Sequence, residues 1–138
     1  MFIALQRPRP GDGDNGAASL EAVILFPALL LVIFTAMEIA LWFYARNLAL
    51  AAAQEGVRAG RAEHATASAG IPAARRFIDR AADDTLQGAT ISSHRSTATQ
   101  VRIRVAGRSL SVLPGVPGLP VAQESRASVE RFTTPGQP

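Results

Sequence analysis

The residues best suited to chemistry in this chain are two carboxylates associated with a long apolar run, Glu21 and Glu38. Glu21 follows the small-residue sequence Gly16-Ala17-Ala18-Ser19-Leu20 and stands directly before the run, whereas Glu38 lies deep within it. A carboxylate that faces hydrocarbon is unfavourable unless it has a partner. Each of the two side chains is therefore expected to act by pairing with another group.

The partner of Glu21 would be created by proteolysis. A cut after Gly16 would make Ala17 the new amino terminus and Glu21 the fifth residue of the mature chain. Within one helix the new amine and the carboxylate would lie about one turn apart. Between staggered chains, the amine of an incoming subunit would neutralise Glu21 of its neighbour and set the register of assembly. The alternative is an ordinary Glu at a helix N-terminus, where negative charge is favoured anyway, and the residues alone leave both interpretations open.

Glu38 and Pro27 both lie inside the apolar run. Glu38 is either protonated and hydrogen-bonded within its own helix or paired with a cationic or polar group of a partner subunit. We prefer the partner subunit, because the run itself contains no Arg. Pro27 removes one helical hydrogen bond, which membrane helices tolerate. It either kinks the helix, which is the safer interpretation, or marks a place where the helix melts during extraction from the bilayer.

Other chemistry is excluded by what the sequence lacks. The absence of Cys rules out disulfides, thiol nucleophiles and Cys-based metal centres. His64 and His94 are far apart and have no acidic cluster beside them, and no nucleophile elbow, P-loop, HExxH or dinucleotide fingerprint occurs. The net charge of +3 is mild, and we interpret Arg102, Arg104 and Arg108 as a solvated sheet face. We therefore expect no enzyme, no metal, no cofactor and no nucleic-acid partner.

The apolar run from Ala22 to Tyr44 predicts a membrane-spanning helix. At ~1.5 Å per residue the run reaches about 35 Å, enough to cross a hydrocarbon core of ~30 Å with some tilt. Trp42 and Tyr44 suit the headgroup layer at its far end. The run is too long for a cleavable secretory signal, and bulky aromatic residues occupy the place where a small-residue cleavage site would be expected. We therefore expect the helix to stay in the mature protein as an anchor.

Beyond the span the helix is expected to continue to Ala62, because this segment is rich in Ala and contains no Pro. Ala52, Gly56 and Gly60 recur every fourth residue and form a ridge of small residues that lets a second helix approach closely. The alternative, which is equally favoured, is that Gly56 and Gly60 simply fray the end of the helix.

The remaining sequence predicts an α+β fold, in which the long transmembrane helix is followed by a small module of one helix and a short antiparallel sheet. The elements expected in the module are a helix from Pro72 to about Leu86 stopped by Gly88, a strand through Val101, Ile103 and Val105, a turn at Gly107-Arg108, a strand from Ser109 to Leu113, a Pro/Gly-rich connection to Pro120, an edge strand from Val121 to Phe132 and a loose tail. We expect a leader over residues 1–16, the helix over 17–62 and the module over 63–138.

The motif from Gly16 to Glu21 resembles the processing site of type IV prepilins. Together with Pro27, Glu38 and the Ala-rich stretch through Gln54–Gly60, it resembles the TadE-like proteins, pseudopilins of the tight-adherence (Flp) pilus system. The resemblance implies cleavage by a prepilin peptidase after Gly16 and a minor or accessory role in pilus assembly or associated secretion. It also implies other pilins or pseudopilins, the peptidase and an inner-membrane assembly platform as partners.

The resemblance further implies a single-pass protein of the bacterial plasma membrane with a cytoplasmic amino terminus, and the extracellular pilus as a further location. By the positive-inside rule, the arginines near the ends of the span do not support this orientation; they are Arg7 and Arg9 before it and Arg46, Arg58 and Arg61 after it. We expect the amino terminus to be cytoplasmic because the leader is short and the folding module lies beyond the span. The rival interpretation is an uncleaved single-pass anchor that presents a small binding module outside the cell.

Overall fold

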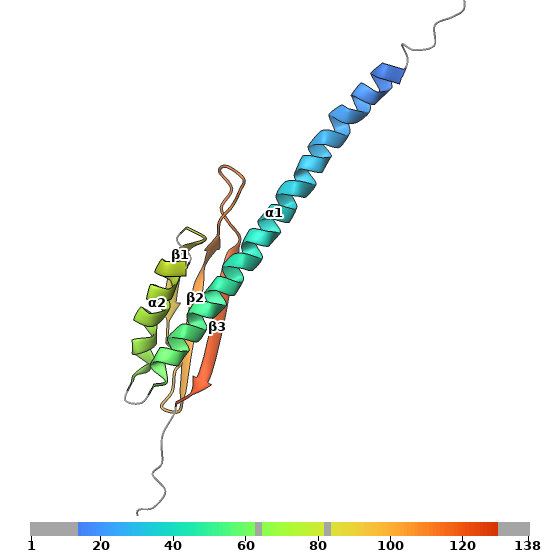
Figure 1. Ribbon diagram of the computed structural model, residues 1–138. Helices are drawn as coiled ribbons and strands as arrows, with labels where there is room; N and C mark the ends of the chain where they lie inside the picture. The colour runs from blue at the N-terminus through green and yellow to red at the C-terminus, as the bar shows by residue number, and fades with distance from the viewer. Residues whose placement is uncertain (1–13, 63–64, 82–83, 130–138) are drawn as a thin grey trace, which may run out of the picture. The chain divides into compact units, whose positions relative to one another are not determined.

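The computed structural model describes residues 14–62, 65–81 and 84–129. They form an α+β fold, as expected (Figure 1). In chain order the elements are α1 (Asp14–Gly60), a short 3₁₀ helix η1 (Ala67–Ala69), α2 (Gly70–Ala81), β1 (Leu86–Ser92), β2 (Gln100–Ser109) and β3 (Pro120–Ser128). The chain divides between Thr35 and Ala36 into two compact units.

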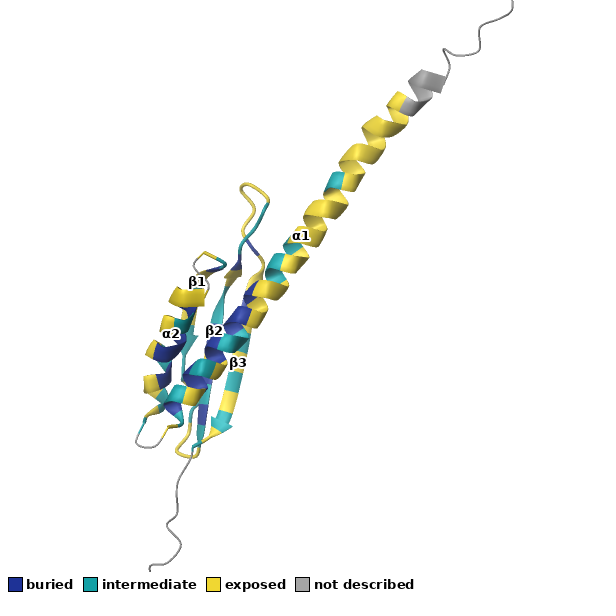
Figure 2. Cartoon of the chain, viewed as in Figure 1, coloured by how far each residue is buried: buried dark blue, intermediate teal, exposed yellow. Residues whose placement is uncertain are grey.

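The first unit contains the amino-terminal part of α1. Apart from Leu30, which is half-buried, its large apolar residues are exposed (Figure 2), from Phe34 at 39% to Leu31 at 70%. The helix is not interrupted at Pro27. This uninterrupted, outward-facing apolar surface is what a helix surrounded by lipid requires.

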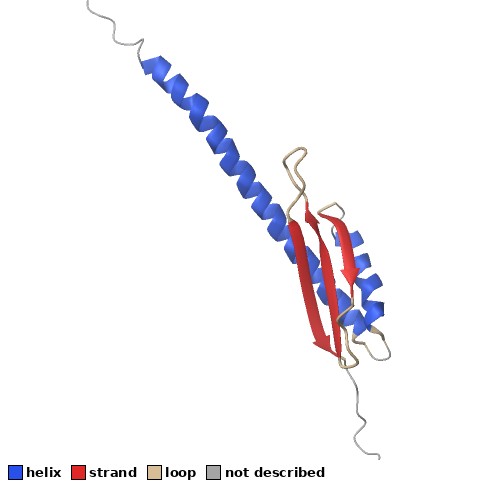
Figure 3. Ribbon diagram, turned by 180° about the vertical axis from the view of Figure 1, so that it is seen from behind, coloured by secondary structure: helices blue, strands red, loops and turns tan. Residues whose placement is uncertain are grey.

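The second unit is a two-layer module. Its sheet is antiparallel with the strand order β1-β2-β3, so β2 is central. The carboxy-terminal half of α1 and the whole of α2 cover one face of this sheet, and the other face is open (Figure 3). The core between the layers contains Ala45, Leu48, Ala49, Ala52, Ala53, Val57, Ala74, Ile78, Leu86, Val101, Ile103, Val105 and Val121.

Two sequence patterns account for this core. The buried residues of α1 recur at intervals of three and four, which places them on one helical stripe. In β2, Val101, Ile103 and Val105 are buried while Arg102 and Arg104 point to the open face. The two-residue period predicted for this strand is therefore confirmed.

The predicted helix from Pro72 to about Leu86 is wrong at its end. α2 stops at Ala81, and Leu86 begins β1, where its side chain is 5% exposed. The prediction failed because Leu86 fits the helical spacing of the preceding apolar residues, although it is the first residue of a strand. Gly88 does not stop a helix, because it lies within β1 at φ 60°, beside the irregularity in the pairing of β1 with β2.

The predicted turn at Gly107-Arg108 and the strand from Ser109 to Leu113 are also wrong. β2 continues through both residues to Ser109, and a loop follows. Gly107 is required by a close approach of strands, since a Cβ there would lie 2.9 Å from the Gln87 carbonyl oxygen. The predicted edge strand is confirmed as β3, but Glu130–Phe132, the tail, and residues 1–13 of the leader lie outside the described residues.

Candidate functional site

The predicted processing motif lies at the beginning of α1. The helix starts at Asp14, so Gly16 and Ala17 are already helical, and the side chain of Glu21 is exposed. Glu21 lies four positions after Ala17 in the helix, which is about 6 Å along the axis. This backbone arrangement is compatible with pairing between a new amine at Ala17 and the carboxylate, either within one chain or between neighbours.

Glu38 has partners within its own chain. Its Oε1 accepts a hydrogen bond of 2.6 Å from the Ser111 hydroxyl and one of 2.9 Å from the Val112 backbone N–H. Both donors belong to the loop between β2 and β3. The sequence led us to prefer a group from a partner subunit, and the structure instead supplies donors 73 and 74 residues further along the same chain.

Trp42, one helical turn after Glu38, makes a second link to the same loop. Its indole N–H donates to the Pro120 carbonyl oxygen at 3.1 Å. The Arg46 guanidinium lies 5.7 Å from the centre of the indole ring, within range of a cation–π interaction. The outgoing end of the loop is therefore fixed at Glu38 and the returning end at Trp42.

The small-residue ridge of Ala52, Gly56 and Gly60 is buried inside the module. A Cβ on Gly56 would lie 2.9 Å from the Gly70 carbonyl oxygen and 3.1 Å from both the Ala74 Cβ and the Ile103 Cγ2. The helix that approaches this ridge is thus α2 of the same chain. In the structure α1 remains helical to Gly60.

The family of the amino-terminal segment follows from a direct comparison. The model of the TadE-like protein family matches residues 16–58. This segment is TadE-like. The match begins at the Gly of the predicted processing motif and covers Glu21, Pro27 and Glu38, so it confirms the resemblance noted in the sequence. Neither the curated proteins nor the solved structures include a significant match to the chain.

The likeness covers 43 of the 138 residues, from the start of α1 through its apolar part. The helical residues Ser19–Gly60 include a segment long and apolar enough to cross a membrane, and none of that segment is buried. The apolar helix therefore supports membrane anchoring of the chain.

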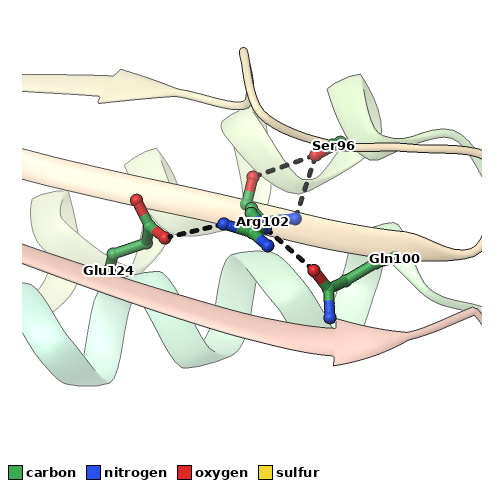
Figure 4. A network of polar contacts seen from close by, with 4 residues as sticks. All are labelled: Ser96, Gln100, Arg102 and Glu124. Carbon is green, nitrogen blue, oxygen red and sulfur yellow. Dashed lines mark hydrogen bonds and ion pairs between the residues drawn. The ribbon is translucent and has the colours of Figure 1, made fainter.

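The open face of the sheet carries the arginines noted in the sequence. Figure 4 shows Arg102 on β2, whose Nε donates to Gln100 Oε1 at 2.9 Å and whose Nη1 lies 3.8 Å from Glu124 Oε1. The Ser96 hydroxyl bridges the main chain of Arg102, accepting from its N–H at 2.9 Å and donating to its carbonyl oxygen at 3.1 Å. Through its main chain Arg102 links β2 to the β1–β2 connection, and through its side chain it links β2 to β3.

Within the described parts of the chain, no group of three or more His, Cys, Asp or Glu side chains is arranged to hold a metal ion. A shallow hollow on the open face is lined by Ser92, His94, Arg95, Arg102, Arg104 and Glu124. The lining contains three arginines and one carboxylate. Among these lining residues, no hydroxyl is hydrogen-bonded to a histidine or carboxylate that could activate it as a nucleophile. The features that do stand out are those of the TadE-like helix and of the loop fixed to it.

Proposed function

We propose that this protein is a TadE-like minor pilin or pseudopilin, a structural component of pilus assembly or associated secretion that is cleaved by a prepilin peptidase after Gly16. The observation that carries the proposal is the family match, which begins at Gly16 and continues through the apolar part of α1 to residue 58. The organisation proposed with it is a leader over residues 1–16, the helix over 17–62 and the module over 63–138.

In the proposed mechanism, the apolar part of α1 stores the subunit in the bilayer until cleavage exposes the amine of Ala17. The amine of an incoming subunit then neutralises Glu21 of a subunit already assembled, and helix packing holds the new subunit in place. Two observations support assembly through the amino-terminal part of α1 and not through its small-residue ridge. Glu21 is exposed and therefore accessible to another chain, while Gly56 and Gly60 are already buried in their own module.

The proposed topology places the amino terminus in the cytoplasm and the module outside the plasma membrane. The peptidase and the inner-membrane assembly platform would then act on the helix, and other pilins or pseudopilins would pack against it. Pro27 would allow local adjustment of the helix as it leaves the bilayer, since a proline weakens the hydrogen bonding of its own turn.

Substitution of Glu21 by Ala tests the assembly step. We expect Glu21→Ala to insert into the membrane at the normal level but to be lost from purified pili or pseudopilus complexes. Glu55→Ala is the matched control, because Glu55 lies on the same helix and its ion pair with Arg58, at 3.7 Å, is a surface pair that contributes little. Normal incorporation of Glu21→Ala would contradict the proposed role of the carboxylate.

Substitution of Gly16 by Val tests the processing step separately. A branched side chain at the cut point obstructs the close approach of a peptidase to the backbone, so Gly16→Val is expected to retain the leader and run at a higher mass than the wild type. Identical masses for the two proteins would favour the rival function, an uncleaved anchor that presents a binding module.

A further inference from the structure

The loop between β2 and β3 presents an apolar tip. From Leu110 to Gln123 the chain contains no charged residue. At the tip, Leu113 and Val116 are 37% and 51% exposed, and Leu119, near the base, is 46% exposed. Three large apolar side chains on one short loop are an unusual concentration for a surface that faces only water.

Hydrogen bonds give this loop a defined shape. At its base the Ser109 N–H donates to the Leu119 carbonyl oxygen at 2.9 Å, and the Leu119 N–H donates to the Ser109 hydroxyl at 3.0 Å. At its tip the Val116 N–H donates to the Leu113 carbonyl oxygen at 3.2 Å, across a turn that contains Gly115 at φ 77°. The apolar side chains are therefore exposed because of the folded conformation of the loop.

The links to α1 fix the place of this loop along the helix. Glu38 and Trp42 hold its two ends, and Glu38 is also where the uncharged stretch that begins at Ala22 ends. Neither a charged carboxylate nor a loop backbone is favourable where it faces hydrocarbon. A carboxylate that accepts hydrogen bonds from a folded loop is therefore suited to the polar interface of a bilayer.

The length of the helix agrees with a membrane boundary at this point. From Ala22 to Met37 the uncharged part of the helix reaches about 24 Å at ~1.5 Å per residue, which spans most of a hydrocarbon core of ~30 Å, and a bilayer accommodates a short span by thinning locally. Trp42 then falls in the headgroup layer, where its amphipathic ring is favoured. Since the loop is fixed at Glu38 and Trp42, its two ends are held beside the residues at this boundary.

We infer that the tip of this loop, residues 113–117, inserts into the interface of the bilayer that α1 crosses. The partner is the lipid surface itself, recognised through apolar burial and not through headgroup charge, because the loop has no cation to offer an anionic lipid. This second contact fixes the depth and the rotation of the module at the membrane. The inference rests on α1 crossing a membrane, and neither cleavage nor the direction of insertion enters it.

Fluorescence of single-cysteine variants tests this contact. The chain has no native Cys, so Val116→Cys can carry a single environment-sensitive nitrobenzoxadiazole label. The labelled full-length protein is reconstituted into phosphatidylcholine nanodiscs with and without nitroxide-labelled lipid. The control is His94→Cys, an exposed position in the β1–β2 connection at the other end of β2. A second tip variant, Leu113→Cys, covers the case in which the label at Val116 perturbs the loop.

We expect nitroxide lipid to quench the tip labels at least twofold more than the His94→Cys label, with no change between low and high salt. Equal quenching at the tip and at the control would overturn the inference. A tip label that is shielded from water but not quenched by nitroxide lipid would also overturn it, in favour of a protein partner. Both measurements use the unassembled protein, so they stand or fall independently of the proposed role in pilus assembly.

Discussion

The junction of α1, α2 and β2 at Gly56 provides a quantitative test of the fold. Replacement of Gly56 by Val adds a branched side chain where even a Cβ would lie 2.9 Å from the Gly70 carbonyl oxygen and 3.1 Å from Ile103 Cγ2. Side-chain contacts can relax by small rotations, but the carbonyl oxygen belongs to the backbone of α2. We therefore expect α2 to be displaced from α1 rather than to accommodate the new methyl groups.

The expected destabilisation follows from known costs of overpacking. Extra methyl or methylene groups in a close-packed core cost about 1–3 kcal/mol, and Gly56→Val should fall near 3 kcal/mol because its nearest neighbour is backbone. At 1.4 kcal/mol per factor of ten, the equilibrium constant for unfolding would rise more than a hundredfold. With a urea dependence of about 1–3 kcal/mol per M, the midpoint of unfolding would fall by about 1–3 M.

The assay is urea unfolding of the full-length protein in mild detergent, followed by the emission of its single tryptophan. Trp42 is suited to this purpose because its indole is hydrogen-bonded to Pro120 at the start of β3. Gln54→Val is the matched control, since it introduces the same side chain on an exposed face of the same helix and should cost less than about 1 kcal/mol. Equal midpoints for Gly56→Val and Gln54→Val would refute the packing described here.

Three further predictions concern the core and the loop. Ile103→Ala, at a side chain with 0% exposure, should lower the free energy of unfolding by about 2–5 kcal/mol in urea titrations; a loss below 1 kcal/mol would mean that the site is not a packed core. Glu38→Gln replaces the carboxylate by a weaker acceptor for the loop donors and should accelerate hydrogen exchange of the β2–β3 loop amides. The control Glu124→Gln, on the open face, should leave that exchange unchanged. Faster loop exchange in Glu124→Gln than in Glu38→Gln would contradict the links described. Gly118→Ala should disrupt the base of the same loop, because a Cβ there would overlap the Ser109 carbonyl, and unchanged exchange of the loop amides would show that the base is not closed in this way.

The sequence predicted the elements that have a regular pattern. The apolar run predicted the exposed part of α1, and the alternation of Val101, Ile103 and Val105 with arginines predicted β2. Both signals are local, since a helix and a half-buried strand each repeat within a few residues. The family of the amino-terminal segment was also accessible from sequence, because the motif is contiguous from Gly16 to Glu21.

The features that escaped prediction depend on residues distant in sequence. Nothing near Glu38 indicates that Ser111 and Val112 will meet it, since the contact exists only after β2 and β3 pack beside α1. The small-residue ridge was recognised, but its neighbour, α2, follows from tertiary packing of Gly70 and Ala74. Such contacts reflect the fold of the whole module, which no local period encodes.

The identity of the mature amino terminus tests the proposed function most directly. Protein extracted from native membranes would be examined by intact-mass and terminal-peptide mass spectrometry. The account predicts a chain that starts at Ala17, the residue four positions before Glu21. A chain that starts at Met1 would contradict it and leave the likeness to TadE-like proteins as one of architecture alone.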